Sequence, residues 1–310
     1  MKMTDKNKFL FIPALAVMGV IYSALFPVNR MSVEYGLPNI GYVFWFSLLA
    51  TLVLLAVTAY KKELRPLTWP HLRAYLVLGA IGVALPVPLL TFLAPKLPVG
   101  IITLLMVLVP LLTYAMSYFL RIEKFRISGM AGVLLGLGGM LFVLIPQTGL
   151  PTPDMVGWVL LALVGPLCFA SCNAFVVILS PPGTPSLMMA AGMSAGATIL
   201  LAPVMVASGH AFVFPTATLD GNLVILYAAA ITAAVMVAWF FLVRITGPVF
   251  FSQFNYFIVL GGFGWGYILH DESHSFWVWI ATAMAFAGLA IFTHGTKGLE
   301  KVEEAPAPAE

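Results

Sequence analysis

One long apolar run, residues 98–120, carries polar side chains at helical spacing. Its distinctive residues fall three or four positions apart: Thr103, Met106, Pro110, Thr113 and Ser117. This spacing places them on one face of an α-helix. Hydroxyl groups in such a run either contact a solute in the protein interior, or bond to a carbonyl of their own helix and help neighbouring helices pack. The sequence leaves both interpretations open.

Two asparagines inside apolar runs are stronger candidates for binding a solute. Asn29 and Asn255 carry amides, which are costly to bury without a hydrogen-bond partner. Arg30 lies beside Asn29 and four residues before Glu34. That spacing allows a simple ion pair at a helix end, and it equally allows a gating or substrate-binding role.

Ionisable side chains avoid the centres of the apolar runs. All twelve carboxylates lie in connections, in the tails or at the ends of runs. A charge at the centre of a bilayer costs about 2.5–3.5 kcal/mol or more. The lack of a central carboxylate argues against a carboxylate proton relay, and the lack of a basic cluster argues against phosphorylated substrates. Neutral, zwitterionic or aromatic solutes fit this pattern best.

Metal and redox chemistry find little support in the sequence. His270, Asp271, Glu272 and His274 share one connection and could bind a metal. All five histidines lie outside the apolar runs, and we interpret this connection as a solvated loop. Cys168 and Cys172, four positions apart, are interpreted as small apolar side chains. We predict no catalytic residue, no metal and no cofactor.

The composition identifies the elements that must position these residues. Hydrophobic residues make up 61% of the 310 residues and charged residues 9%, against about a quarter charged in soluble domains. Lipid solvates such a surface, and each span needs about 20 apolar residues. We therefore predict an all-α membrane protein with ten transmembrane helices. The apolar runs are 9–31, 40–60, 73–94, 98–120, 127–146, 155–179, 184–208, 222–243, 247–269 and 275–293.

Positive charge is distributed unevenly between the two sides of these spans. With the N-terminus inside, thirteen of the fifteen Lys and Arg residues fall on the inner side, and only Arg30 and Lys96 fall outside. Inner loops are enriched in Lys and Arg. We expect a multi-pass protein of the bacterial inner membrane with both termini in the cytoplasm.

An internal repeat relates the two halves of the chain. Gly19 matches Gly165 and Lys96 matches Arg244, and the offsets of the matched positions drift from 146 to 149 residues. A five-span unit is odd, so its second copy is inverted, which is typical of alternating-access transporters. The expected parts are an N-terminus (1–8), a first repeat (9–146), a periplasmic linker (147–154), a second, inverted repeat (155–294) and a disordered cytoplasmic tail (295–310).

Glycine and proline patterns leave further alternatives. The GxxxG steps Gly132–Gly136 and Gly262–Gly266 allow close helix packing or homodimerisation. Pro86 and Pro88 must break hydrogen bonds within the third span, where they either hinge a gate or shape a cavity wall.

The chain resembles the EamA-type exporters of the drug/metabolite transporter superfamily. The resemblance rests on Leu85-Pro86-Val87-Pro88-Leu89-Leu90, on Lys96-Leu97-Pro98-Val99-Gly100, and on Pro110 followed by Glu123-Lys124. Val259 replaces the proline expected in the second half, and Trp45-Phe46 stands where the family often has an arginine. The resemblance implies ten helices around a central cavity lined mainly by spans one, three, four, six, eight and nine.

We therefore expect a transporter that exports small metabolites such as amino acids, and we do not expect an enzyme. The alternatives are an integral-membrane enzyme acting on lipid and an accessory membrane subunit. The expected partners are a small-molecule substrate and the lipid bilayer, without nucleic acid, for a monomer or homodimer. The candidate substrate-binding residues are Tyr22, Phe26, Asn29, Arg30, Trp45, Thr91, Thr103, Met106, Pro110, Thr113, Cys172, Trp239, Ser252, Asn255 and Tyr256.

Overall fold

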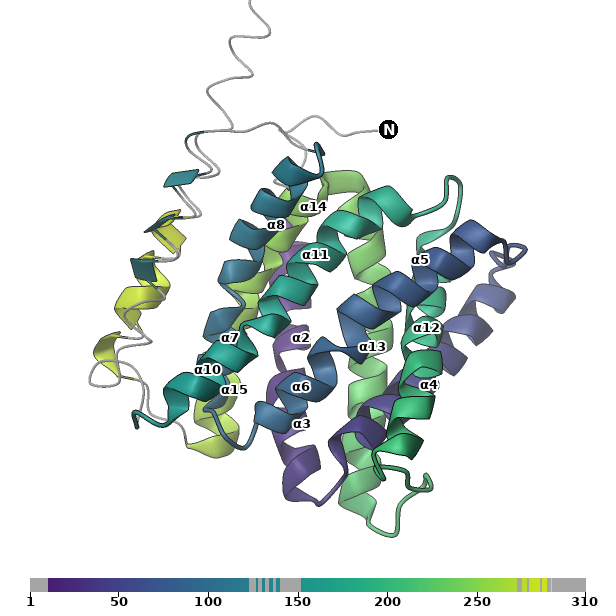
Figure 1. The fold of residues 1–310 in the computed structure, drawn as a ribbon, viewed down its shortest axis with the longest axis horizontal. Helices are drawn as coiled ribbons and strands as arrows, with labels where there is room; N and C mark the ends of the chain where they lie inside the picture. The colour runs from purple at the N-terminus through teal and green to yellow at the C-terminus, as the bar shows by residue number, and fades with distance from the viewer. Residues whose placement is uncertain are drawn as a thin grey trace, which may run out of the picture.

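A computed structural model describes residues 11–122 and 152–271, with parts of 127–139 and 275–291. The described residues form helices and no β-strand, packed side by side as Figure 1 shows. In chain order the helices are α2 (Ile12–Ser23), α3 (Leu25–Glu34), α4 (Asn39–Tyr60), α5 (Trp69–Gly79), the π-helical turn η2 (Ala80–Ala84), α6 (Pro86–Leu93), α7 (Val99–Leu105), α8 (Leu108–Phe119), α10 (Met155–Ala162), α11 (Val164–Leu179), α12 (Ser186–Ala207), α13 (Leu219–Thr246), α14 (Pro248–Ser252) and α15 (Phe254–His270).

Seven helical segments in the described chain are long and apolar enough to cross a membrane. The shortest has 21 residues, about 32 Å at 1.5 Å per residue, against a hydrocarbon core of about 30 Å. The segments are Ile12–Glu34, Asn39–Tyr60, Trp69–Leu93, Val99–Phe119, Met155–Leu179, Ser186–Ala207 and Leu219–Thr246.

Three predicted spans are not among these seven segments. The ninth run contains α14 and the 17-residue α15. The fifth run, with Gly132 and Gly136, lies largely outside the described residues, the tenth run is described in part, and Glu272 in the connection before it lies outside. The count of ten spans therefore stays a prediction.

Large apolar side chains cover much of the outer surface. Val17 is 61% exposed, Leu52 55% and Phe119 76%. Such side chains are unfavourable in water and favourable against lipid acyl chains. The segment Val99–Phe119 differs, because 83% of its most apolar stretch of 18 residues is buried inside the protein. This span therefore lies at the centre of the bundle.

Proline interrupts the third span, as the sequence predicts. Pro86 has no N–H to donate to Gly82, and its ring would crowd that carbonyl in a regular helix. The chain instead widens into η2, where the Leu85 N–H donates to the Ala80 carbonyl at 2.9 Å. Turns of this kind are rare and often mark functional sites. The span thus consists of α5, η2 and α6.

Four other spans break at one or two residues. The breaks at Ala24 and at Leu163 precede Pro27 and Pro166 by three residues, and the break at Met106–Val107 precedes Pro110. The break at Gln253 has no such proline. Even so, Tyr256 N–H donates to the Gln253 carbonyl at 3.1 Å, just as Val109 N–H donates to the Met106 carbonyl at 3.0 Å.

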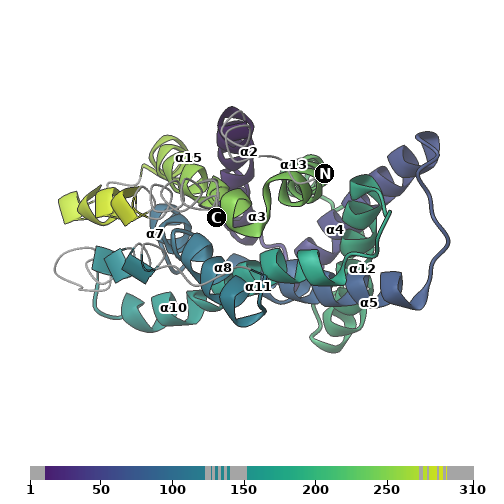
Figure 2. The ribbon, with the colours of Figure 1, turned by 90° about the horizontal axis from the view of Figure 1, so that it is seen from above.

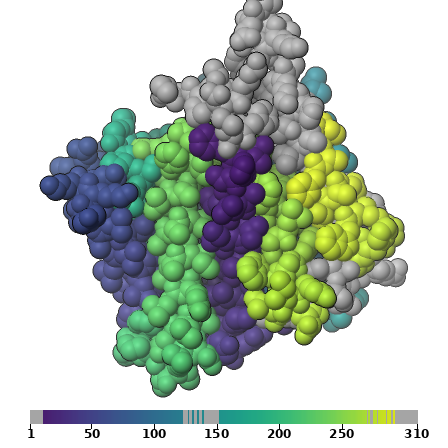
Figure 3. Space-filling view, turned by 180° about the vertical axis from the view of Figure 1, so that it is seen from behind, coloured from purple at the N-terminus to yellow at the C-terminus, as the bar shows by residue number. Residues whose placement is uncertain are grey.

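Neighbouring spans come from distant parts of the sequence. α12 packs along α4 and α5, α15 along α2, and α11 along α8. Figure 2 shows α4, α5 and α12 grouped at one end of the bundle, and Figure 3 shows the purple α2–α3 strip between green α13 and yellow-green α15. Gly19 permits one close approach, because a Cβ there would lie 2.8 Å from the Phe254 carbonyl oxygen.

Candidate functional site

A cavity of about 100 Å³ lies inside the bundle. That volume holds several water molecules or a small solute, since one water needs roughly 10–15 Å³ measured in this way. Its wall combines residues of α2, α3, α4, η2, α6 and α8 with residues of α11, α12, α13 and α15. Segments on both sides of residue 150 therefore build it.

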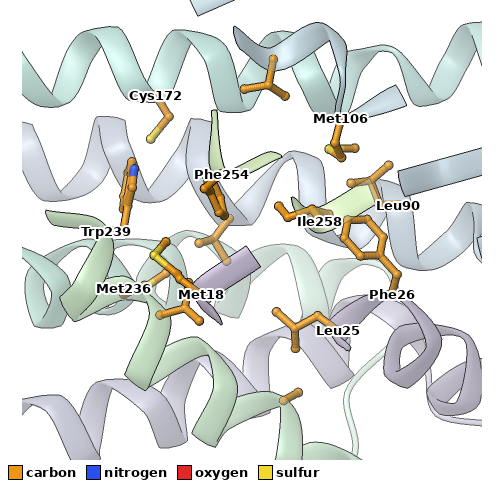
Figure 4. Close-up of a cluster of buried hydrophobic side chains, with 14 of the residues drawn as sticks. Met18, Leu25, Phe26, Leu90, Met106, Cys172, Met236, Trp239, Phe254 and Ile258 are labelled. Atoms are coloured by element: carbon orange, nitrogen blue, oxygen red, sulfur yellow. The ribbon is translucent and has the colours of Figure 1, made fainter. Parts of the chain in front are cut away.

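Aromatic rings make up much of the cavity wall. Six line it: Tyr22, Phe26, Phe46, Phe169, Trp239 and Phe254. Tyr22 meets Phe26 and Phe254 edge to face, with ring centroids 6.2 and 6.0 Å apart. Figure 4 shows Trp239, Phe254 and Cys172 gathered in this region, with Phe26 and Leu90 farther along. Flat apolar walls of this kind suit planar or apolar parts of a solute.

Three amides supply most of the polarity of the wall. Asn29 Oδ1 accepts a hydrogen bond from the Tyr42 hydroxyl at 3.0 Å. Asn173 Oδ1 accepts one from Trp239 Nε1 at 3.0 Å. Asn255 Nδ2 donates to the Ser252 carbonyl at 2.7 Å. Each amide keeps at least one further donor or acceptor group, so the cavity can exchange hydrogen bonds with a bound molecule.

None of the described residues that line the wall is Asp, Glu, Lys, Arg or His. Among the described residues no group of three or more His, Cys, Asp or Glu side chains is placed to hold a metal. The connection with His270, Glu272 and His274 lies partly outside the described residues. The described cavity is thus suited to binding by shape and hydrogen bonds.

Comparison with known proteins gives a family match. The sequence pattern of the EamA-like transporter family matches residues 10–145. That family lies within the drug/metabolite transporter superfamily. The spanning helices, together with this family match, indicate a multi-pass membrane protein.

A solved structure, titled only as a crystal structure of a protein, resembles the whole chain. It shares 20% sequence identity and a TM-score of 0.62, over 93% of this chain and 99% of the other. At that identity the likeness concerns the fold alone. No curated protein matches the chain.

Six of the predicted binding residues lie at the cavity wall. They are Tyr22, Phe26, Asn29, Cys172, Trp239 and Asn255. The cavity draws on all six spans that the family resemblance implies, and it adds Phe46 from α4 and Met193 from α12. Contact of these residues with a substrate stays a prediction.

The predicted hydroxyl residues lie elsewhere in the chain. Thr91, Thr103 and Ser252 each donate to a carbonyl three or four residues earlier in their own helix. The Thr103 side chain also packs against Gly262 of α15. Thr113 accepts a weak bond from Asn173 Nδ2 at 3.4 Å. Hydroxyls reach the preceding turn easily, so burial does not force them towards a cavity.

Five further candidates also lie outside the cavity wall: Arg30, Trp45, Met106, Pro110 and Tyr256. Met106 is fully buried at the helix break before Pro110. Tyr256 packs on Phe286, with ring centroids 5.3 Å apart. Arg30 Nε bonds to Glu34 Oε1 at 3.0 Å on the surface, which favours the ion-pair interpretation.

Trp45 lies beneath the connection between α12 and α13. Its Nε1 donates to the Phe212 carbonyl at 3.0 Å, and its ring packs on Phe212 and Phe214. The arginine position of the family, where this chain has Trp45, therefore faces a loop, while the neighbouring Phe46 lines the cavity.

Sequence reasoning missed Asn173, the amide with the most cross-span contacts. It follows Cys172 directly in an apolar run, and the burial argument applied to Asn29 and Asn255 selects it equally well. Thr232 of α13 was also missed at the wall. One hydroxyl in an apolar run gives no comparable signal in the sequence.

Proposed function

We propose that this protein exports small neutral, zwitterionic or aromatic metabolites, such as amino acids, by alternating access. The observation that carries the proposal is the cavity: both halves of the chain line it, its wall is aromatic and amide-bearing, and no charged side chain faces it. A site without a fixed charge favours solutes that need no strong counter-charge. A membrane enzyme would need an acid, base or metal set, which the cavity wall does not contain.

The proposed architecture is two inverted five-span repeats, residues 9–146 and 155–294. Exchanging the two halves replaces span one by six and span nine by four, so the α2–α15 contact corresponds to the α11–α8 contact. It also replaces span seven by two and span three by eight, so the α12–α5 contact corresponds to the α4–α13 contact. All four contacts are extensive. Packing that persists under this exchange supports a pseudo-symmetric pair of repeats with its site between them.

The proposed orientation places both termini in the cytoplasm of a bacterium. In Figure 1 the α4–α5 connection and the C-terminal ends of α8 and α13 lie along the upper edge, and the α3–α4 and α6–α7 connections along the lower edge. The described Lys and Arg residues at or near the upper edge are Lys61, Lys62, Arg65, Arg73, Arg121 and Arg244. Those at or near the lower edge are Arg30 and Lys96. Positive residues favour the cytoplasmic side, which supports assigning the upper edge to it.

Transport by the purified full-length chain in liposomes tests this proposal. We expect uptake of at least one radiolabelled solute from a panel of amino acids and other neutral metabolites. Asn255→Leu should lower that uptake at least several-fold, because it removes an amide from the wall. Asn222→Leu is the matched control, since Asn222 lies in the first turn of α13, outside the cavity wall, and its side chain bonds to Thr216. Correctly folded protein without flux for any solute class would refute transport.

A further inference from the structure

Asn173 is held between two partners from other spans. Trp239 Nε1 of α13 donates to Asn173 Oδ1 at 3.0 Å, and Asn173 Nδ2 lies 3.4 Å from Thr113 Oγ1 of α8. The asparagine is 4% exposed and the threonine fully buried. Three spans therefore meet at one carboxamide, and both Asn173 and Trp239 line the cavity.

The chemistry of the tryptophan fixes which way this carboxamide points. An indole N–H donates and never accepts, so the group facing Trp239 must be the amide oxygen. The amide nitrogen then faces Thr113 and the cavity. It carries two hydrogens, and Thr113 is its one hydrogen-bond partner among the described residues. One N–H is left to be donated into the cavity.

The other two cavity amides differ from Asn173. Tyr42 can donate or accept, so its bond to Asn29 does not fix the direction of that amide. Asn255 donates to the Ser252 carbonyl, which accepts only, so its oxygen is left as an acceptor. Asn173 is therefore the cavity amide whose donor role is fixed by its neighbours.

We infer that Asn173 is a specificity-determining residue that donates a hydrogen bond to an acceptor on the solute, with Trp239 as the positioning residue that sets its direction. The inference rests on the proposed transport function of the same cavity. The ligand class is a neutral planar solute with a ring-nitrogen acceptor, because aromatic rings such as Tyr22 and Phe254 form the adjoining wall.

Two probes of nearly identical shape test this assignment. Nicotinamide and benzamide are both neutral, planar and soluble, and differ only in one ring-nitrogen acceptor. Binding of each to the purified full-length protein is measured by titration. We expect nicotinamide to bind roughly 3- to 10-fold more tightly, the effect of one hydrogen bond. Asn173→Leu should bring the ratio of the two dissociation constants close to one.

Trp239→Phe separates positioning from a merely structural role. It keeps an aromatic wall but frees the Asn173 amide to turn, so the ratio of the two dissociation constants should fall towards one. Equal weakening of both probes would assign Trp239 a structural role only. Asn222→Leu, outside the cavity, should leave the ratio unchanged.

Three results would overturn the assignment of Asn173: equal affinity of both probes in the unaltered protein, binding of neither probe, or a ratio that survives Asn173→Leu. Liposome flux of any solute, measured in parallel, keeps the transport proposal standing in each case. The two proposals can therefore fail separately.

Discussion

Buried hydroxyls and buried amides behave differently in this protein. Thr51, Thr58 and Thr198 each donate to a carbonyl four residues earlier, as do several predicted binding residues. A hydroxyl is short enough to bond within its own helix. An amide has two donors and an acceptor, more than one turn of helix can satisfy. Amides in the spans therefore face other spans or the cavity, and they mark the site better than hydroxyls do.

Trp45 ties the α12–α13 connection to the start of α4. We expect Trp45→Phe to lower the free energy of unfolding by about 1 kcal/mol, because the part-buried Phe212 carbonyl loses its donor. The melting temperature should fall, and amide hydrogen exchange at 209–214 should become faster, because Gly41 and Trp45 both contact this segment.

Trp69→Phe is the control for this change, since Trp69 is 74% exposed at the start of α5. It should alter neither the melting temperature nor exchange at 209–214. Unchanged exchange in Trp45→Phe would show that ring packing alone holds the connection.

At the scale of the helices, the third span is the least regular wall of the cavity. Gly82 and Val83 of η2 line the cavity directly before Pro86. Pro86→Ala restores the N–H that would bond to the Gly82 carbonyl in a regular helix, so we expect the wide turn η2 to give way to α-helical bonding up to Pro88. The melting temperature should stay equal or rise, while transport of a radiolabelled solute in liposomes should fall several-fold as the wall turns.

Pro203→Ala provides the matched comparison, because Pro203 sits inside the unbroken helix α12 and outside the cavity wall. Its transport should match that of the unaltered protein. Full transport by Pro86→Ala would mean that the π-helical turn only accommodates the proline.

At the scale of the whole molecule, alternating access requires that the cavity opens to each side in turn. Cys172 lines the cavity and is 1% exposed, and Cys168 is the one other cysteine of the chain. In the Cys168→Ser variant, a small membrane-impermeant thiol reagent should label Cys172 in right-side-out and in inside-out vesicles. A transported solute should slow labelling from both sides.

Cys172→Ser leaves Cys168, which is buried outside the cavity wall, as the comparison thiol. Its labelling should be slow from both sides and indifferent to the solute. Labelling of Cys172 from one side only would contradict alternating access.

The sequence by itself determined the helices and most of their ends. The predicted runs 40–60 and 184–208 became α4, Asn39–Tyr60, and α12, Ser186–Ala207. Bilayer thickness demands long apolar runs, and proline cannot donate a backbone hydrogen bond, so both features are local and legible in the chain. The match to the EamA-like transporter family rests likewise on sequence patterns, in residues 10–145.

The tertiary structure alone decided which side chains face the cavity. Thr103 and Asn255 were both candidates for binding a solute, yet Thr103 meets Gly262 while Asn255 faces the cavity. Trp239 meets Asn173 across 66 positions of sequence. Periodicity gives the face of a helix, but the rotation and bending of each helix against its neighbours decide what that face meets.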